Sequence, residues 1–146
     1  MSVSKPVPAN FIRVPHQSRF SRHMGIFYVP EDQSSESEYV KVGMLLEEPH
    51  TGGSGRGHGG VTMTLLDEAM GRAASEAAGC MCMTISMTTN FCSSTEIGGF
   101  ICASARVTRR GQNIVFVDGE LHDSRGRLVG SATGTWVNTQ EPIPGR

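Results

Sequence analysis

The sequence has few aromatic residues, almost no net charge and no long apolar segment. Aromatic side chains make up 6% of the 146 residues, and 13 lysines and arginines balance 14 aspartates and glutamates, for a formal net charge of -1. Such a chain lacks the overall positive field that captures nucleic acid or anionic lipid. No apolar run approaches the roughly 18 residues that span a bilayer. Any anionic ligand must therefore be held by a local group of residues.

The length and composition fit one globular domain. Hydrophobic residues make up 38% and charged residues 18% of the chain. A chain of 146 residues can bury a sizeable core but is too short for a second, cofactor-binding domain. The first ten residues, 1–10, contain no apolar stretch of the length found in secretory signals. We therefore expect a cytoplasmic protein.

The spacing of the cysteines does not suggest a metal site. The four cysteines are Cys80, Cys82, Cys92 and Cys102, in segments that otherwise resemble a protein core. A C-x-C pair followed by two nine-residue gaps matches none of the usual zinc spacings. We expect free thiols in a reducing compartment, and no bound metal.

One segment has the periodicity of a long helix. Between Gly59 and Ala78, apolar residues recur at helical spacing, and Gly79 provides a suitable stop. The apolar positions are Val61, Leu65, Leu66, Ala69, Ala73 and Ala77. No other part of the sequence gives a comparable helical pattern.

Alternating or apolar segments predict strands on both sides of this helix. The expected strands are 25–29, 39–46, 83–91, 100–108, 113–122 and 127–137, with hairpin connectors at 110–112 and 123–126. In 83–91 we expect Met83, Ile85, Met87 and Phe91 on one side. Tight turns and a single helix imply an α+β fold with a mostly antiparallel sheet over one helix. We divide the chain into an N-terminal arm with one short helix (1–24), the domain (25–138) and a C-terminal tail (139–146).

A glycine-rich loop precedes the helix. Six of the nine residues from Gly52 to Gly60 are glycine, and residues 55–60 satisfy G-x-G-x-x-G. A dinucleotide site would need further alternating strands and helices, and a nucleotide-hydrolase phosphate loop would need Lys where Val61 stands. Two interpretations stay open. The free N–H groups at the helix start bind a phosphate or a developing oxyanion, or the loop is only a flexible linker.

Asp67 lies inside the predicted helix, on the side opposite the apolar stripe. Its neighbours by helical angle are small or apolar, namely Gly60, Met63, Met70, Gly71, Ala74 and Ala78. We expect a second protein surface to cover this face, which an isolated protomer would expose. A partly desolvated carboxylate there is a candidate general base, and a solvated charge near the helix start is the alternative.

The motifs around these residues resemble those of hotdog-fold acyl-CoA thioesterases of the phenylacetate-degradation (PaaI-like) branch. His58-Gly59-Gly60 is followed by Thr64-Leu65-Leu66-Asp67, so that the acidic residue comes nine positions after the histidine, as in that family. Further matches are the strand 84–91, the turn 109–112 and the segments 126–129 and 132–135. The likeness covers roughly residues 38–137.

The resemblance implies a sheet wrapped around one long helix and a homodimer or dimer of dimers with active sites at the subunit interface. It implies that Asp67 acts as general base or nucleophile, that the Gly59 N–H polarises the thioester carbonyl, and that His58 shapes the loop and orients the thioester. A hydroxyl that assists the attacking water falls at Thr84 in some relatives. The alternatives are a histidine that only bonds backbone and an ordinary strand threonine. No metal or separate cofactor is implied, because CoA is part of the substrate.

Substrate-binding positions are implied in the same way, with one departure from the pattern. They are Gly60, Phe91, Ser93, Ser94, Arg109, Arg110, Gly111 and Gln112, although the last four can equally be a charged hairpin turn. Many relatives have Asn or Gln six positions before the histidine, where Gly52 stands here, and His50, Thr51 or Ser54 is a candidate replacement.

We therefore predict an acyl-CoA thioesterase. Two other functions compete with it, a non-catalytic acyl-CoA-binding module and a hotdog enoyl-CoA hydratase or dehydratase. The acyl group and the choice between dimer and tetramer are not readable from the residues.

Overall fold

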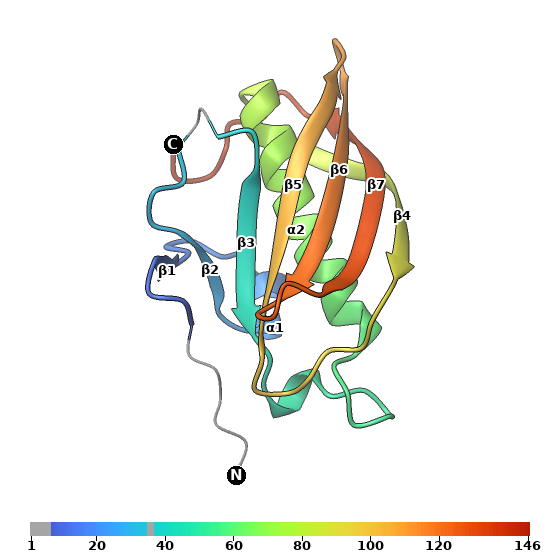
Figure 1. Ribbon diagram of the computed structural model, residues 1–146. Coiled ribbons are helices and arrows are strands. Elements are labelled where there is room, and N and C mark those ends of the chain that lie inside the picture. The colour runs from blue at the N-terminus through green and yellow to red at the C-terminus, as the bar shows by residue number, and fades with distance from the viewer. Residues whose placement is uncertain (1–6, 35–36) are drawn as a thin grey trace.

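The computed structural model describes residues 7–34 and 37–146, where seven antiparallel strands form one sheet that curves around one long helix (Figure 1). The sheet order is β1-β2-β3-β5-β6-β7-β4. This arrangement confirms the predicted α+β hotdog fold. In chain order, the elements are β1 (Phe11–Arg13), α1 (Arg19–Met24), β2 (Phe27–Pro30), β3 (Val40–Leu45), a 3-10 turn (Glu48–His50), α2 (Gly59–Ala78), β4 (Cys82–Phe91), β5 (Phe100–Arg110), β6 (Ile114–Asp123) and β7 (Leu128–Asn138).

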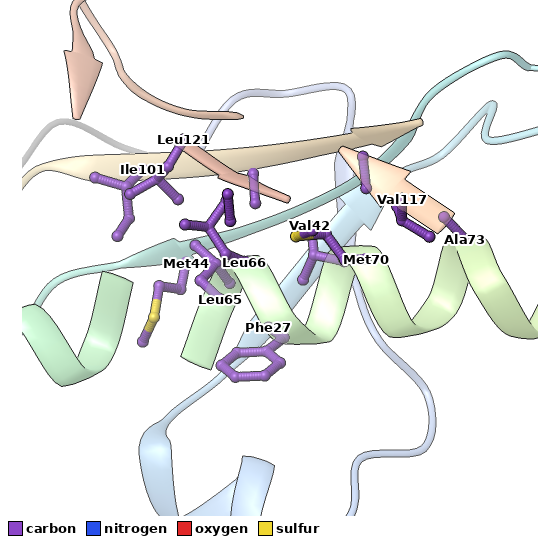
Figure 2. Close-up of a cluster of buried hydrophobic side chains, with 14 of the residues drawn as sticks. Phe27, Val42, Met44, Leu65, Leu66, Met70, Ala73, Ile101, Val117 and Leu121 are labelled. Carbon is purple, nitrogen blue, oxygen red and sulfur yellow. The ribbon is translucent and has the colours of Figure 1, made fainter. Parts of the chain in front are cut away.

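Helix α2 begins and ends where the sequence predicts. The His58 side chain caps its start by accepting a hydrogen bond from the Gly60 N–H at 2.8 Å. Gly79 ends it in the left-handed conformation, with φ of 74°, and donates its N–H to the Ser75 carbonyl. Between these caps, the apolar face of α2 packs on the sheet. Figure 2 shows Leu65 and Leu66 among the buried side chains of the surrounding strands.

The sheet covers a wider arc of α2 than the helical angles alone predict. Met70 and Ala74, which we expected on the face that an isolated protomer exposes, have no exposed surface. Strand β6 reaches Met70 because Gly119 leaves space for it, and a Cβ atom at Gly119 would lie 2.8 Å from the Met70 sulfur. That part of the prediction is wrong, and Met63 is the large side chain of this face that stays exposed.

Strand β4 departs from the alternation predicted for it. Its pairing with β7 shifts register between Thr84 and Ser86, and Thr84 lies opposite the buried Trp136. Such a bulge turns the chain locally and re-aims side chains. Met83 and Ile85 are therefore 63% and 55% exposed, and do not form one buried face with Met87.

The segment before residue 25 contributes more structure than the expected short helix. That helix is α1, and β1 adds a strand next to β2 that the sequence pattern did not indicate. Residues 1–6, which make up most of the segment tested for a secretory signal, lie outside the described residues. Among the described residues, no helix is both long and apolar enough to cross a membrane.

Candidate functional site

The Asp67 carboxylate is held by a side chain from the sheet. Asp67 lies in the third turn of α2 and is half-buried, and the Thr84 hydroxyl of β4 donates a hydrogen bond to its Oδ1 at 2.7 Å. The bulge in β4 places Thr84 on the side of the sheet that meets α2. Two residues that the sequence suggests separately are thus in direct contact. A threonine in that contact fixes the carboxylate in one orientation.

Asp67 also lines a cavity of about 570 Å³ on the outer side of α2. Gly71 and Arg72 lie next along the helix, and Trp136 and Cys82 line the cavity from the sheet. Further walls come from residues 14–18 and 143–146, and other side chains of α2, some of them charged, line the cavity as well. Sequence reasoning missed these wall residues, because none belongs to a local motif and only the fold brings them together.

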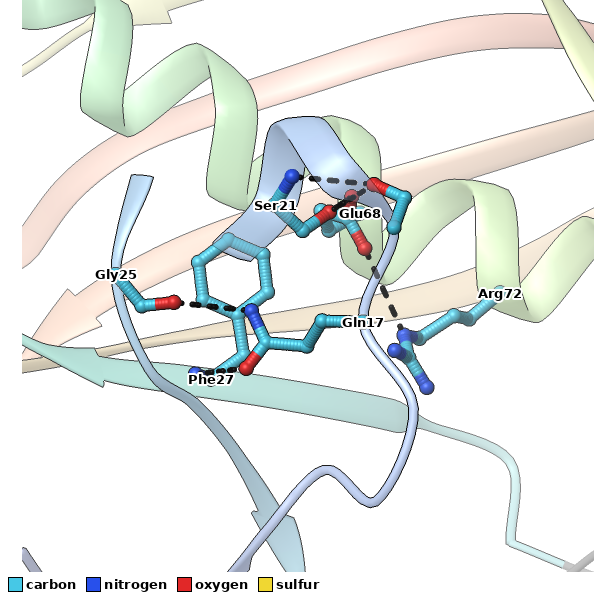
Figure 3. Close-up of polar contacts among 7 residues, drawn as sticks. Gln17, Ser21, Gly25, Phe27, Glu68 and Arg72 are labelled. Atoms are coloured by element: carbon cyan, nitrogen blue, oxygen red, sulfur yellow. Dashed lines mark hydrogen bonds and ion pairs between the residues drawn. The ribbon is translucent and has the colours of Figure 1, made fainter. Parts of the chain in front are cut away.

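Helix α1 fixes the wall formed by the N-terminal arm (Figure 3). The Ser21 hydroxyl donates to a Glu68 carboxylate oxygen, and the Arg72 guanidinium lies 3.8 Å from the other oxygen of Glu68. Gln17 donates to the Gly25 carbonyl and accepts from the Phe27 N–H, each at 3.0 Å. These contacts attach the arm to both α2 and β2.

The start of α2 offers one N–H group for an oxygen ligand. The first N–H groups of a helix have no partner within it. The Gly60 and Val61 N–H groups donate to the His58 side chain and carbonyl, whereas the Gly59 N–H has no acceptor in the part of the chain that the structure describes. His58 therefore bonds backbone, as the alternative interpretation stated, and by doing so leaves Gly59 as the available donor.

The glycine loop has a fixed shape. Gly57 donates its N–H to the Thr95 carbonyl at 3.1 Å, and a Cβ atom at Gly57 would overlap the Thr95 hydroxyl. The His58 N–H donates to the His50 carbonyl at 2.8 Å. The loop is held at both of these points, which argues against a flexible linker.

The residues considered as replacements at Gly52 face other partners. The His50 ring is buried, where it accepts from the Glu47 N–H and bonds the Met24 carbonyl. The Thr51 hydroxyl donates to the Glu48 carbonyl at 2.7 Å. The donor groups of both side chains are therefore engaged within the protein, and Ser54 stays an untested candidate.

Four of the eight expected substrate-binding residues lie at or beside the helix start. The Phe91 ring lies against Gly59, where a Cβ atom would be 3.1 Å from it. The Ser93 N–H donates to the Val129 carbonyl, and the Ser94 carbonyl accepts from the Arg127 guanidinium at 3.0 Å. Gly60 is itself the second residue of α2.

The other four, Arg109, Arg110, Gly111 and Gln112, lie at the opposite end of the protomer, in the β5–β6 hairpin (Figure 1). The Cys92 N–H donates a hydrogen bond to the Val129 carbonyl of β7, whereas the Asn113 carbonyl accepts one from the Asn138 N–H of β7. The nine residues of strand between these points span about 30 Å. One protomer therefore does not bring the two groups together.

The candidate base, Asp67, and the candidate oxyanion donor, Gly59, are also far apart. Gly59 and Asp67 are eight residues apart on one straight helix, which is about 12 Å along its axis. The nucleophile and the oxyanion donor must each lie within about 3 Å of the same reacting group. Gly59 and Asp67 of one protomer therefore cannot both contact that group directly.

No group of three or more His, Cys, Asp or Glu residues within residues 7–34 and 37–146 is placed to hold a metal ion. The chemistry available on these residues is that of a carboxylate, a backbone N–H and a hydroxyl.

Comparison with known proteins gives consistent results. The family model described as Thioesterase superfamily matches residues 55–130. A Pseudomonas aeruginosa protein whose name describes it as a putative esterase is 28% identical over 132 residues, which are 89% of this chain and 96% of that protein.

Solved structures have the same fold. The E. coli PaaI protein from the phenylacetic acid degradation operon superposes with a TM-score of 0.69 at 21% identity, over 73% of this chain and 77% of its own. A Streptococcus mutans protein, smu.793, bound to acetyl CoA superposes with a TM-score of 0.70 at 22% identity, over 95% and 96%.

Proposed function

We propose that this chain, which belongs to the Thioesterase superfamily, hydrolyses an acyl-CoA thioester to the free acid and CoA. The observation that carries the proposal is the Asp67 carboxylate, bonded by Thr84 at 2.7 Å and lining a cavity on α2. Family membership supports thioester chemistry, and the acetyl CoA bound to the S. mutans neighbour supports CoA as the carrier.

In the proposed reaction, Asp67 removes a proton from a water molecule whose oxygen attacks the thioester carbonyl carbon. The carbonyl electrons move onto oxygen, where a Gly59 N–H stabilises the negative charge. The tetrahedral intermediate then collapses, the carbon–sulfur bond breaks, and the CoA sulfur takes up the proton. A positioned base typically contributes 10² to 10⁴ in rate, and one oxyanion donor about 10² to 10³.

Asp67 can also attack the carbonyl carbon itself, which would form a mixed anhydride that water then cleaves. A single turnover in ¹⁸O-water tests for the nucleophile route. Label in the Asp67 carboxylate requires that route, with water attacking the aspartyl carbon of the anhydride. Water that attacks the acyl carbon of the anhydride labels the product acid, as the general-base route does.

The 12 Å separation along α2 implies that one site uses two copies of the chain. If two α2 helices run antiparallel side by side, Asp67 of one lies beside Gly59 of the other, and two equivalent sites form. Strand β4 fits such a dimer. It is a ten-residue edge strand with exposed apolar side chains, and an edge of this kind is open to pairing with another strand.

The same two-fold arrangement would bring the β5–β6 hairpin of one protomer to the end where Gly59 and Phe91 of the other lie. Arg109 and Arg110 are then available to pair with CoA phosphates, to which guanidinium groups bind strongly. Within this proposal, Gly60, Ser93 and Ser94 line the path between the thioester and those phosphates. We place the reaction in the cytoplasm, because four free thiols suit a reducing compartment.

The test compares the wild type with Asp67→Asn on a panel of acyl-CoAs, followed by loss of the thioester absorbance. We expect kcat to fall at least a hundredfold with an unchanged circular dichroism spectrum. The exposed carboxylate of Asp118 on β6 provides the control, and Asp118→Asn should retain activity.

Three results would contradict the proposal. Undiminished hydrolysis by Asp67→Asn would remove Asp67 as the base. Tight binding of acyl-CoA without thiol release by the wild type would indicate a binding module instead. Hydration of an enoyl-CoA without thioester cleavage would indicate a hydratase.

A further inference from the structure

The cavity beside Asp67 continues along α2 and ends at residues 139–146, which we call the strap. Gly71 and Ser75 follow Asp67 at intervals of four residues, so the three form one row along the helix and all line the cavity. Gly71 leaves the middle of the row open, and a Cβ atom there would lie 3.4 Å from the Trp136 indole nitrogen. This row leads away from the carboxylate toward the strap.

The strap is attached to the domain at several points. The Met81 N–H donates to the Glu141 carbonyl at 2.8 Å, and the Thr139 N–H donates to the Met81 carbonyl at 3.0 Å. Farther on, the Arg146 guanidinium lies 3.0 Å from the Glu76 carboxylate of α2. The strap therefore crosses α2 near its last turn, instead of extending away as a tail.

The strap and the N-terminal arm together line the far end of the cavity. Ile143 and Pro144 line it from the strap, and Val14 and Pro15 line it from the arm. The two segments meet at Gly145, where a Cβ atom would lie 3.4 Å from the His16 ring. That end of the cavity thus has apolar side chains next to the Arg146–Glu76 ion pair.

The geometry points to the strap as the part of the chain that limits the length of the acyl group, with an unbranched apolar acyl chain of about ten carbons as the preferred substrate. This inference rests on the proposed thioesterase function. The eight residue steps from Asp67 to Ser75 cover about 12 Å of helix axis. An extended chain of single bonds advances about 1.2 Å per bond, so roughly ten bonds fit between the carboxylate and the strap.

Burial of each methylene removes apolar surface from water and favours binding by roughly fourfold. We therefore expect kcat/KM to rise by about this factor per carbon until the chain reaches Ile143 and Pro144. Longer chains meet the strap and gain nothing more.

The experiment measures kcat/KM for saturated acyl-CoAs of two to sixteen carbons. The diagnostic quantity is the ratio of the fourteen-carbon to the six-carbon substrate. Ile143→Ala, and a variant that lacks residues 142–146, should raise this ratio at least tenfold. Gly71→Leu fills the middle of the row and should lower it at least tenfold. The control, Arg106→Ala, breaks an exposed ion pair at 3.2 Å between β5 and Glu38, which precedes β3, and should leave the ratio unchanged.

Equal ratios in the wild type, Ile143→Ala and Gly71→Leu would overturn the role of the strap while leaving the thioesterase proposal intact. The same conclusion holds if Gly71→Leu alone changes the ratio, because the acyl chain would then follow the row without being limited in length by the strap. Failure of the wild type to cleave any acyl-CoA would instead reject the proposed function.

Discussion

Replacing His58 tests how the helix cap and the oxyanion donor are linked. The His58 side chain holds the Gly60 N–H at 2.8 Å, next to the Gly59 N–H to which we assign the oxyanion. His58→Ala removes this acceptor, whereas His58→Asn supplies a side-chain oxygen of the kind that helix caps prefer. The pair of variants separates loss of the cap from loss of the imidazole.

The expected cost of His58→Ala follows from the cap geometry. Loss of a side-chain cap destabilises a protein by about 0.5 to 2 kcal/mol, and the exposed position of His58 favours the lower half of that range. About 1 kcal/mol corresponds to a melting temperature lower by roughly 3 °C for a chain of this size. Urea denaturation at one fixed protomer concentration measures the difference, since dimer formation makes stability depend on concentration. His58→Asn should unfold within a few tenths of a kcal/mol of the wild type.

Activity then distinguishes the two roles of His58 that the sequence left open. If His58 acts only through the cap, kcat falls in His58→Ala and recovers in His58→Asn. If the ring also orients the thioester, His58→Asn recovers stability but not kcat. Equal urea midpoints for the wild type and His58→Ala would refute the reasoning, because the capping bond would then contribute nothing.

Three further outcomes follow from the polar contacts. Thr84→Val removes the bond to the Asp67 carboxylate and should lower kcat roughly tenfold, whereas Thr84→Ser should keep most of it. Burial raises the pKa of Cys102 to about 11, so iodoacetamide at pH 8 should modify the exposed Cys92 well before Cys102, as mass spectrometry of peptides would show. Burial tends to raise the pKa of Asp123, but hydrogen bonds from the Arg127 and Arg125 N–H groups and the Arg127 guanidinium lower it overall. A carboxyl group whose pKa is lower in the folded than in the unfolded protein stabilises the fold at pH values above its unfolded pKa. This stabilisation is lost progressively as the pH falls below about 4. The urea midpoint of Asp123→Asn should therefore drop less than that of the wild type between pH 7 and pH 3, and equal drops would contradict this assignment.

The sequence predicts α2 accurately because its signals are local. The helical spacing of apolar residues and the stop at Gly79 act within one segment, and the helix bounds agree with the prediction. Strand β1 has three residues and depends on pairing with β2, so no period could indicate it. The bulge at Thr84 and the burial of Met70 depend on sheet curvature, which is a property of several strands together.

Prediction of the candidate site from the sequence has the same limit. The spacing of His58 and Asp67 places both on one helix, but the contact between Thr84 and Asp67 depends on how β4 is bent. The strap looked like a tail because residues 139–146 contain no regular pattern, and its contacts with Met81 and Glu76 are long-range. Local motifs in the sequence cannot predict contacts between residues that only the tertiary structure brings together.

The interval between Gly59 and Asp67 also predicts which residue lies on the two-fold axis of the proposed dimer. A two-fold that places Asp67 beside Gly59 of the other copy brings the midpoint of the interval, Met63, against the same residue of its partner. Met63 is 40% exposed in one protomer, unlike the buried Met70. Met63→Glu would place two like charges together at an apolar contact, so we expect sedimentation velocity to show monomers and thioesterase activity to be lost with them. Ile12→Glu changes a similarly exposed residue on β1, at the opposite edge of the sheet from β4, and should leave the dimer intact. A Met63→Glu protein that stays dimeric and active would mean that base and oxyanion donor are brought together in some other way.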